Sequence, residues 1–538
     1  MLHIKGKIQN ITLMSIGILV IFFFQNEVIL NFPNSQDDYN FLSVVYYFEK
    51  SEFTLWELIK FLFEYQAFPH KIILSKLYLL VYVKIFSSIN FKILTLAINL
   101  LQNIFFVYFS AKILNFKKQK ITFLLPFIFI YFNLDCHIDN LGLMSAGQHF
   151  SSLLFLIIYA YYLPRKIYFA LIISIICPFI SGEGLVILPL TILYLLLKKQ
   201  SIVKYYSVLA VAIIIFFIFY NFPSDGINPN DSHSNFLNLW SNKIQSFFLF
   251  LGGAFPLRSN GHPFLINTIW GIISLISFFY LKYLDFKKTK KLNIESIDLI
   301  ILTLIGMAAM VSIARGDGNE LLNTSLALRF KFYHYIFCLF IFYKILLQFP
   351  RLILPLCLTG GFIFFYGNYI GINNYYLGKS KLISDEMSFK RNGSFYSFNE
   401  SGGKTNNLFS KTNFKFTDKL LDTNLIIKAV KFKNYSKNIE SKINFSRENS
   451  NTFKLTIFQS KFPIKNINKN AFLIILKNEN IKDILPLNSF LFTNYEYLYF
   501  KNLNLDKSNP YSYFKIIIDS NFSILQMEKI ENSVISFL

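Results

Sequence analysis

Long apolar runs dominate the first two thirds of the chain, and short basic clusters separate many of them. A membrane-crossing helix needs roughly 20 apolar residues, because about 30 Å of hydrocarbon is crossed at about 1.5 Å per residue. The first run extends from Ile11 to Phe24, and similar runs recur as far as the one from Leu352 to Ile370. The pattern predicts an all-α polytopic membrane protein with about 11 to 13 transmembrane helices.

The first apolar run looks like a signal peptide, but no A-x-A-like cleavage site follows it, so we expect a retained helix. Lys5 and Lys7 precede the run and place the N-terminus in the cytoplasm by the positive-inside rule. Residues 25–71 then form the first outer loop. Within this loop, four apolar residues at helical spacing predict an amphipathic helix at the membrane interface, with a helix in solvent as the alternative. They are Leu55, Leu58, Ile59 and Leu62.

Basic clusters that close apolar runs orient the later segments. Arg165-Lys166, Lys198-Lys199 and the cluster from Lys287 to Lys291 are expected on the cytoplasmic side. If Lys117 to Lys120 is cytoplasmic too, the outer turns cover residues 135–149, 181–184, 222–262 and 315–328. Two full crossings between residues 72 and 114 would conflict with this assignment. Either one of those runs does not cross, or the cluster at Lys117 is an exception.

The composition changes after residue 370. Residues 1–374 are expected to form the transmembrane domain, and residues 375–538, rich in Lys, Asn and Ser, a small soluble C-terminal domain. Short β-branched stretches such as Phe472 to Leu476 and Phe514 to Ile518 predict an α/β or β-rich fold. This domain lies outside the membrane if the number of spans is odd.

The composition supports the membrane assignment and excludes several other classes. Hydrophobic residues make up 54% of the chain and charged residues 16%, against about 25% charged in globular proteins. The net charge of +22 reflects Lys at the ends of apolar runs and in the tail, and no nucleic-acid recognition motif accompanies it. The four cysteines show no paired spacing, so neither a zinc site nor a disulfide framework is expected.

Two adjacent carboxylates lie in the polar stretch from Asn34 to Asn40, just outside the first helix. Asp37 and Asp38 point in different directions on any regular element, so both cannot face one target. One of them could act as a general base while the other binds a cation. The alternative is that Asp38 caps a helix that starts at Tyr39.

Four cations are candidates for binding a phosphate on the outer side. His70 and Lys71 open the second apolar run, although Lys71 could instead extend to the interface. Arg315 ends a later run. Arg329 lies inside the next one and requires an anionic partner, for which a phosphate or a carboxylate is suited.

Other polar residues at outer turns could bind a substrate or an ion. Gln148 and His149 begin a helix, and Glu183 lies between two glycines at the tip of a hairpin, where a plain polar turn is the alternative. The remaining set alternates along a segment assumed to be extended, so its members would share one face and could bind a divalent metal ion, unless the segment is a solvated loop. This set is Asp135, His137 and Asp139.

The layout resembles the GT-C superfamily of membrane glycosyltransferases. The likeness rests on Asp37-Asp38 in the first outer loop, the amphipathic segment, the motif Pro69-His70-Lys71, the many spans and the C-terminal domain. The chain is also similar to polytopic proteins of surface-polysaccharide clusters. That likeness rests on Gly147-Gln148-His149, on Ser181 to Gly184, and on Arg315-Gly316 with Arg329-Phe330. At the junction between the loop and the next helix, this chain has His70-Lys71, whereas His-Arg is more usual in the superfamily.

The resemblance implies transfer of a sugar from a polyprenyl-phosphate carrier to a cell-envelope glycan or lipid acceptor, outside a bacterial inner membrane. Asp37 or Asp38 would be the base, and Arg329, with Arg315, His70 and Lys71, would stabilise the departing phosphate. Gln148, His149 and Glu183 would bind substrate, and a divalent ion is the one cofactor suggested. The alternatives are a polysaccharide polymerase, a ligase, a lipid-linked sugar flippase and a secondary transporter. A transporter is typified by repeats, and none is evident here.

Overall fold

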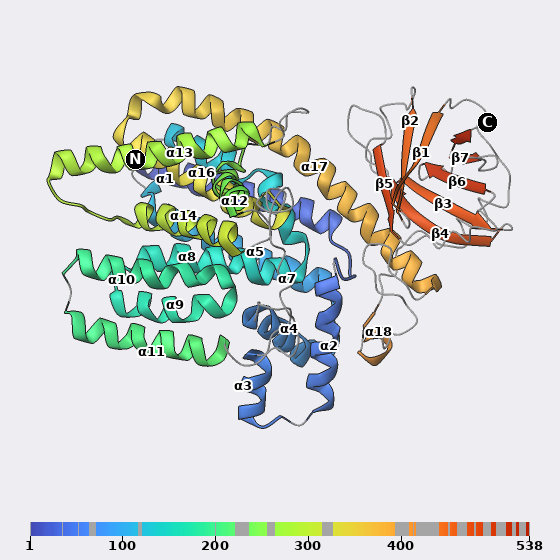
Figure 1. Ribbon diagram of the computed structural model, residues 1–538, viewed down its shortest axis with the longest axis horizontal. Helices are drawn as coiled ribbons and strands as arrows, with labels where there is room; N and C mark the ends of the chain where they lie inside the picture. The colour runs from blue at the N-terminus through green and yellow to red at the C-terminus, as the bar shows by residue number, and fades with distance from the viewer. Residues whose placement is uncertain are drawn as a thin grey trace. The chain divides into compact units, whose positions relative to one another are not determined.

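The computed structural model is mostly helical (Figure 1). It describes residues 2–34, 36–51, 53–63, 72–116, 121–199, 201–220, 236–255, 264–314, 326–392, 408–412 and 414–415, and eight strands between residues 441 and 536. The chain forms two compact units. One comprises Met1–Gln25, Phe48–Ile85 and Leu94–Gly371, and the other comprises Asn26–Tyr47, Phe86–Ile93 and Ile372–Leu538.

The elements up to the middle of the chain alternate long helices with short turns of other helix types. They are α1 (Leu2–Val28), α2 (Gln36–Lys50), α3 (Leu55–Phe63), α4 (Ile73–Phe86), α5 (Phe91–Ile113), η2 (Ile121–Leu124), α6 (Leu125–Tyr131), η3 (Leu134–Leu141), α7 (Leu143–Ser145), η4 (Ala146–Phe150), α8 (Ser151–Tyr162), α9 (Ile167–Ile180), η5 (Gly182–Val186), α10 (Ile187–Leu197) and α11 (Ile202–Tyr220). The later helices are α12 (Phe236–Gly252), α13 (Leu265–Thr289), α14 (Ser296–Ala314), η6 (Leu328–Phe330), α16 (Lys331–Gln348), η7 (Pro350–Leu352), α17 (Ile353–Asn392) and α18 (Leu408–Lys411).

Seven stretches of the described residues are long and apolar enough to cross a membrane, so the chain is a multi-pass membrane protein. An eighth is added if η2–α6 and η3, bent by 42° relative to each other, form one broken span. The seven are Asn10–Val28, Phe91–Ile113, Leu143–Tyr162, Leu265–Thr289, Ser296–Ile313, Leu328–Gln348 and Pro350–Ile372.

Among the described residues, several of the apolar runs behind the expected 11 to 13 spans fold into helices too short for a full crossing. Helix α9 has 14 residues and α10 has 11, whereas about 20 are needed to cross the hydrocarbon. Helix α4 has 14 residues, while α5 has 23. Of the two runs between residues 72 and 114, only the second reaches spanning length, which favours the alternative in which one of them does not cross.

Helix α3 occupies the position of the predicted amphipathic helix, and none of its residues is buried. Leu55 and Trp56 are 76% and 68% exposed. Thr54 and Glu57 close its first turn by a reciprocal pair of bonds, a capping box. The backbone N–H of Thr54 donates to Oε2 of Glu57 over 2.9 Å, and the N–H of Glu57 donates to Oγ1 of Thr54 over 3.3 Å. An exposed apolar surface on a well-capped helix is typical of a segment lying at a membrane interface.

Helix α16 lies at the centre of the first unit. The span that contains it, Leu328–Gln348, is 89% buried, against 17% for Pro350–Ile372. It packs against α6, α12, α13 and α14, and α9, α10 and α11 lie side by side in the same unit (Figure 1). A helix that is buried on all sides must satisfy its polar groups within the protein. The charged residues of α16 therefore need partners on neighbouring elements or on a ligand.

The second unit contains the start of α2, the end of α17, α18 and the strands. The side-chain oxygen of Asn31 accepts from the N–H of Phe91 over 2.9 Å, and the ring of Phe409 stacks on that of Phe32. The strands form two antiparallel sheets, ordered β5-β2-β1-β8 and β4-β3-β6-β7. Their bounds are β1 (Ser441–Asn449), β2 (Thr452–Gln459), β3 (Ala471–Lys477), β4 (Asn480–Leu487), β5 (Glu496–Lys501), β6 (Tyr513–Ile518), β7 (Ser523–Gln526) and β8 (Val534–Ser536).

Candidate functional site

The structure brings together three residues that the sequence suggested for substrate binding. Nδ1 of His149 lies 3.8 Å from Oε1 of Glu183, and both side chains are buried. The amide of Gln148 donates to Oγ of Ser181 over 3.4 Å. A helix start and a hairpin tip that are more than 30 residues apart in sequence therefore meet as one polar cluster inside the first unit.

Local backbone features present these side chains to one another. Gln148 and His149 lie in η4, a single π-helical turn, a rare conformation that occurs frequently at functional sites. On the other side, Pro178 lies inside α9, which ends two residues later at Ile180, and the 3-10 turn η5 begins at Gly182. A Cβ on Gly184 would collide with the carbonyl oxygen of Cys177, so the two backbone segments approach closely at this glycine.

A third wall of the cluster comes from η6 and the start of α16. The hydroxyl of Tyr333 donates to the carbonyl oxygen of His149 over 3.1 Å. The Phe330 ring lies 6.1 Å from the imidazole of His149, centre to centre. The guanidinium of Arg329 lies over the same Phe330 ring at 5.2 Å. The Phe330 ring therefore neighbours both the guanidinium of Arg329 and the imidazole of His149. We call His149, Glu183 and Arg329 together the Glu183 site.

Two buried polar atoms of the Glu183 site lack a hydrogen-bond partner in the described part of the chain. Among the residues that the structure describes, none donates a hydrogen bond to the buried Oε2 of Glu183, and none accepts one from the buried Nε of Arg329. The described carboxylates form no ion pair with Arg329 either. Buried polar groups are nearly always hydrogen-bonded, so this carboxylate oxygen and this guanidinium together suit a ligand that has a hydroxyl group and an anionic group.

The expected metal set is arranged differently. Residues 134–141 form a 3-10 helix rather than an extended loop, so residues two apart do not share a face. Asp135 and His137 are fully buried, and the solvated-loop interpretation is therefore wrong for them. Across the described part of the chain, no three His, Cys, Asp or Glu side chains gather closely enough to hold a metal ion. Asp139 is therefore not part of such a group with Asp135 and His137.

Asp135 instead belongs to a buried ion pair that the sequence did not indicate. Its Oδ2 lies 2.9 Å from Nζ of Lys331 and accepts a 2.9 Å hydrogen bond from the hydroxyl of Tyr335. The side chain of Asn133 accepts from the N–H of Asp135, which fixes the start of the turn. Lys331 directly follows η6, so the ion pair and the Glu183 site are built on consecutive turns of the same segment.

Asp38 lies in the first turn of a helix. Helix α2 starts at Gln36, before the Tyr39 start that was expected, so Asp38 lies in the first turn and is not an N-cap. It is buried, and its Oδ2 accepts from the backbone N–H of Asn34 over 3.1 Å. The side chain of Asp37 lies outside the described residues. His70, Lys71 and Arg315 also lie outside them.

A second charged network joins α13, α14 and α16. It could not be predicted, because its members lie near three separate basic or apolar runs. Nζ of Lys344 lies 3.1 Å from Oδ1 of Asp298, 3.1 Å from Oδ2 of Asp285 and 3.6 Å from Oε2 of Glu295. Lys282 completes the network at 2.9 Å from Asp298. Each of its two lysines contacts more than one carboxylate, so the network links the three helices.

Comparison with known proteins adds no relative from which a function could be transferred. No family model, curated protein or solved structure matches the chain. The function therefore has to be argued from the residues themselves.

Proposed function

We propose that this protein is a membrane glycosyltransferase of the GT-C type that takes its sugar from a polyprenyl-phosphate carrier. The observation that carries the proposal is Arg329, a half-buried cation without a described anionic partner, which packs on the Phe330 ring that also neighbours His149 of the His149–Glu183 pair. A lipid-linked sugar phosphate supplies the missing anion. The acceptor of the sugar supplies the hydroxyl that an open carboxylate oxygen can bind.

The chemistry asks for two opposite functions at one place. The acceptor oxygen attacks the anomeric carbon as its proton moves to a carboxylate, and the electron pair of the breaking bond leaves with the phosphate. A fixed cation stabilises the charge that grows on the phosphate. Arg329 has this role, and a single attack of this kind inverts the anomeric centre.

Two carboxylate groups compete for the role of base. The resemblance to GT-C enzymes favours Asp37 or Asp38, and the geometry favours Glu183, because its Oε2 is open and His149 lies beside Oε1. In the second case the imidazole of His149 holds the carboxylate in place and limits its rotation. Asp37 and Asp38 then bind the carrier or the acceptor in the first outer loop.

The wider proposal concerns location. We place the enzyme in a bacterial inner membrane, with the Glu183 site toward the outer face and the acceptor a cell-envelope glycan or lipid. Residues 375–538 form a β-rich domain outside the membrane. The basic clusters at the ends of apolar runs support this orientation.

The proposal is tested with the purified protein in proteoliposomes and radiolabelled polyprenyl-phosphate sugars. We expect label to leave the carrier in the wild type, and Arg329→Ala to slow this transfer about a hundredfold or more, as for loss of other charge-stabilising groups. Arg351, exposed in η7 just beyond the far end of α16, provides the matched control, and Arg351→Ala should transfer normally.

The same assay identifies the base. Glu183→Gln is compared with the double variant Asp37→Asn, Asp38→Asn. Transfer should be slower by about a hundredfold or more in the variant that lacks the base. If both variants retain full activity with normal expression, the carboxylate mechanism is wrong. If every donor tried is neither bound nor cleaved, the glycosyltransferase assignment is wrong as a whole.

One observation favours a second candidate, a lipid-linked sugar flippase or secondary transporter. Asp135 and Lys331 form a buried charge pair inside the helical unit, and ionisable groups at such positions commonly mark ion or substrate pathways. In that case labelled carrier would cross the vesicle membrane with its sugar still attached. The same proteoliposomes distinguish the two functions by whether label leaves the carrier or changes side. A polysaccharide polymerase or ligase would instead lengthen or transfer a glycan already carried on lipid.

A further inference from the structure

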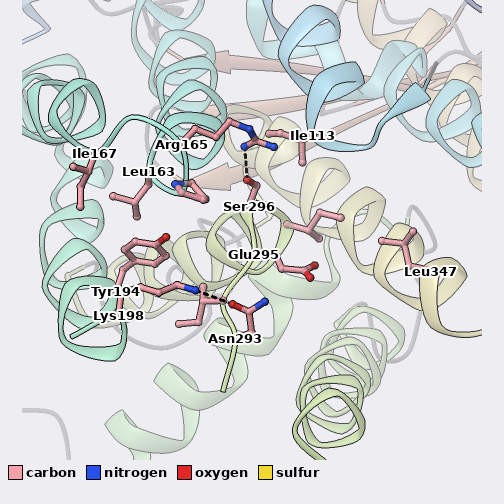
Figure 2. A pocket seen from close by; sticks show the side chains of 13 residues that line it. Ile113, Leu163, Arg165, Ile167, Tyr194, Lys198, Asn293, Glu295, Ser296 and Leu347 are labelled. Carbon is pink, nitrogen blue, oxygen red and sulfur yellow. Dashed lines mark hydrogen bonds between the residues drawn. The ribbon is translucent and has the colours of Figure 1, made fainter. Parts of the chain in front are cut away.

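A cavity lies at the end of the bundle that the basic clusters place in the cytoplasm, lined by residues of several helix ends. Its volume is about 670 Å³, and Figure 2 shows the side chains around it. Arg165 precedes α9, Lys198 ends α10, and the segment from Asn293 to Ser296 leads into α14. The cavity has no part in the Glu183 site, because that site uses the opposite ends of α9 and α10.

Two cations of the cavity are held in place by neutral groups. Nη1 of Arg165 donates to Oγ of Ser296 over 3.2 Å and to the carbonyl oxygen of Tyr161 over 2.6 Å. Nζ of Lys198 donates to Oδ1 of Asn293 over 2.9 Å. In Figure 2 both side chains reach toward the same short segment. Neither cation forms an ion pair with a carboxylate among the described residues, so their positive charge is uncompensated there.

The one carboxylate in the lining is already engaged. Oε2 of Glu295 lies 3.6 Å from Nζ of Lys344, within the charged network of α13, α14 and α16. The cavity therefore presents two positioned donors, Arg165 and Lys198, and a partly neutralised acid. This balance suits a phosphate group, to which Arg can donate two bonds and Lys a compact charge.

The polar side chains make up the larger part of the cavity surface, and aliphatic side chains form a smaller apolar wall beside them. Ile113, Leu163, Ile167 and Leu347 contribute to the same wall, and Leu347 is 48% exposed. A free phosphate or a nucleotide would leave this apolar wall unused. A molecule with a phosphate at one end and a hydrocarbon chain at the other uses both parts of the cavity.

We propose that this cavity binds the headgroup phosphate of an anionic membrane lipid. Arg165 and Lys198 bind the phosphate, and the apolar wall packs against the acyl chain of the lipid. Basic pockets between membrane helices at the cytoplasmic surface are suited to such lipids, and the negative charge of that leaflet supplies them locally. The proposal is independent of the sugar chemistry at the Glu183 site.

The test measures lipid binding by native mass spectrometry on the full-length protein in detergent. The protein is titrated with phosphatidylglycerol or with phosphatidylcholine that has the same acyl chains. We expect one phosphatidylglycerol to bind about tenfold more tightly than phosphatidylcholine. The double variant Arg165→Gln, Lys198→Gln should lose this preference.

The chain offers a matched control at adjacent positions. Lys166 and Lys199 are exposed, directly follow Arg165 and Lys198 in the chain, and do not line the cavity. The double variant Lys166→Gln, Lys199→Gln removes the same charge and should keep the preference for phosphatidylglycerol. Melting temperatures of both variants establish that they are folded. Should the first one fail to fold, Lys198→Gln alone replaces it, with a smaller expected loss of preference.

Three outcomes would overturn the proposal. The first is equal binding of the two lipids by the wild type. The second is an equal loss of preference in the control variant, which would mean that surface charge acts without the cavity. The third is displacement of phosphatidylglycerol by inorganic phosphate at a similar concentration, which would assign the cavity to a soluble anion.

Discussion

Nζ of Lys331 and Oδ2 of Asp135 lie 2.9 Å apart in the interior of the first unit, although 196 positions separate the two residues in the chain. The ion pair ties α16 to the turn between α6 and α7. Because Tyr335 donates to the same carboxylate oxygen, two consecutive turns of α16 depend on Asp135.

Removal of the cation should be more damaging than removal of both charges. Lys331→Met leaves Asp135 buried without its ion-pair partner, which typically costs about 3–5 kcal/mol of folding free energy. The double variant Lys331→Met, Asp135→Asn removes both charges and should recover much of that loss. Melting curves in detergent measure the difference. A double variant as unstable as Lys331→Met alone would contradict the buried ion pair as the source of the effect.

The Tyr335 hydroxyl should contribute separately. Tyr335→Phe keeps the ring and removes a hydrogen bond to a charged acceptor, for which about 1.5–3 kcal/mol is typical. Tyr283 lies 58% exposed on α13, so Tyr283→Phe is the control, and its melting temperature should match that of the wild type. Equal effects of the two substitutions would argue against the hydrogen bond to Asp135.

The turn that carries Glu183 should not tolerate a methyl group. In Gly184→Ala, the new Cβ collides with the carbonyl oxygen of Cys177, and the backbone of a packed turn cannot move away cheaply. We expect a loss of about 1–3 kcal/mol. In Gly361→Ala, the nearest atom to the new Cβ is a ring carbon of Phe129 at 4.0 Å, and the helical site should gain up to about 1 kcal/mol. Opposite shifts in melting temperature are therefore predicted, and parallel shifts would show that the close approach is not what matters.

The capping box of α3 predicts a pH dependence. Hydrogen bonds from the Thr54 side chain and backbone lower the pKa of Glu57. A lowered pKa in the folded state means that the charged carboxylate stabilises the first turn above the ordinary Glu pKa, and that this contribution is lost as the pH falls through the lowered value. A ¹³C NMR titration of the labelled Glu57 carboxyl group should give a lower pKa in the wild type than in Thr54→Ala. Thr54→Ser retains the donors and should titrate like the wild type.

Much of the architecture could be predicted from apolar run length, because hydrocarbon thickness fixes a minimum number of residues. The spans at Asn10–Val28 and Phe91–Ile113 follow the predicted runs. Gln148, His149 and Glu183 could be singled out because polar side chains in apolar surroundings need a partner. Which partner each one finds depends on packing between distant segments, and this could not be read from the chain.

The errors in the sequence interpretation have two physical causes. The extended conformation predicted around Asp135 and His137 is wrong, because residues 134–141 form a 3-10 helix, which changes the directions of both side chains. Lys331 carries no local signal of an ion pair, because it directly precedes a run rich in Phe and Tyr. Its partner lies 196 positions away, and no local pattern carries that information.

The short helix α9 has a consequence for the membrane around it. Its 14 residues are about 21 Å long, whereas the hydrocarbon core is about 30 Å thick. Tyr168 and Ile172 on α9 are more than half exposed, as expected of side chains that face lipid. If α9 nevertheless crosses the bilayer, lipid tails beside it must be compressed to its length, at a cost of a fraction of a kcal/mol for each Å of mismatch. The bilayer would then be locally thin on this flank, and the lipid headgroups at the end of α9 that carries Arg165 would be drawn inward toward Arg165 and Lys198.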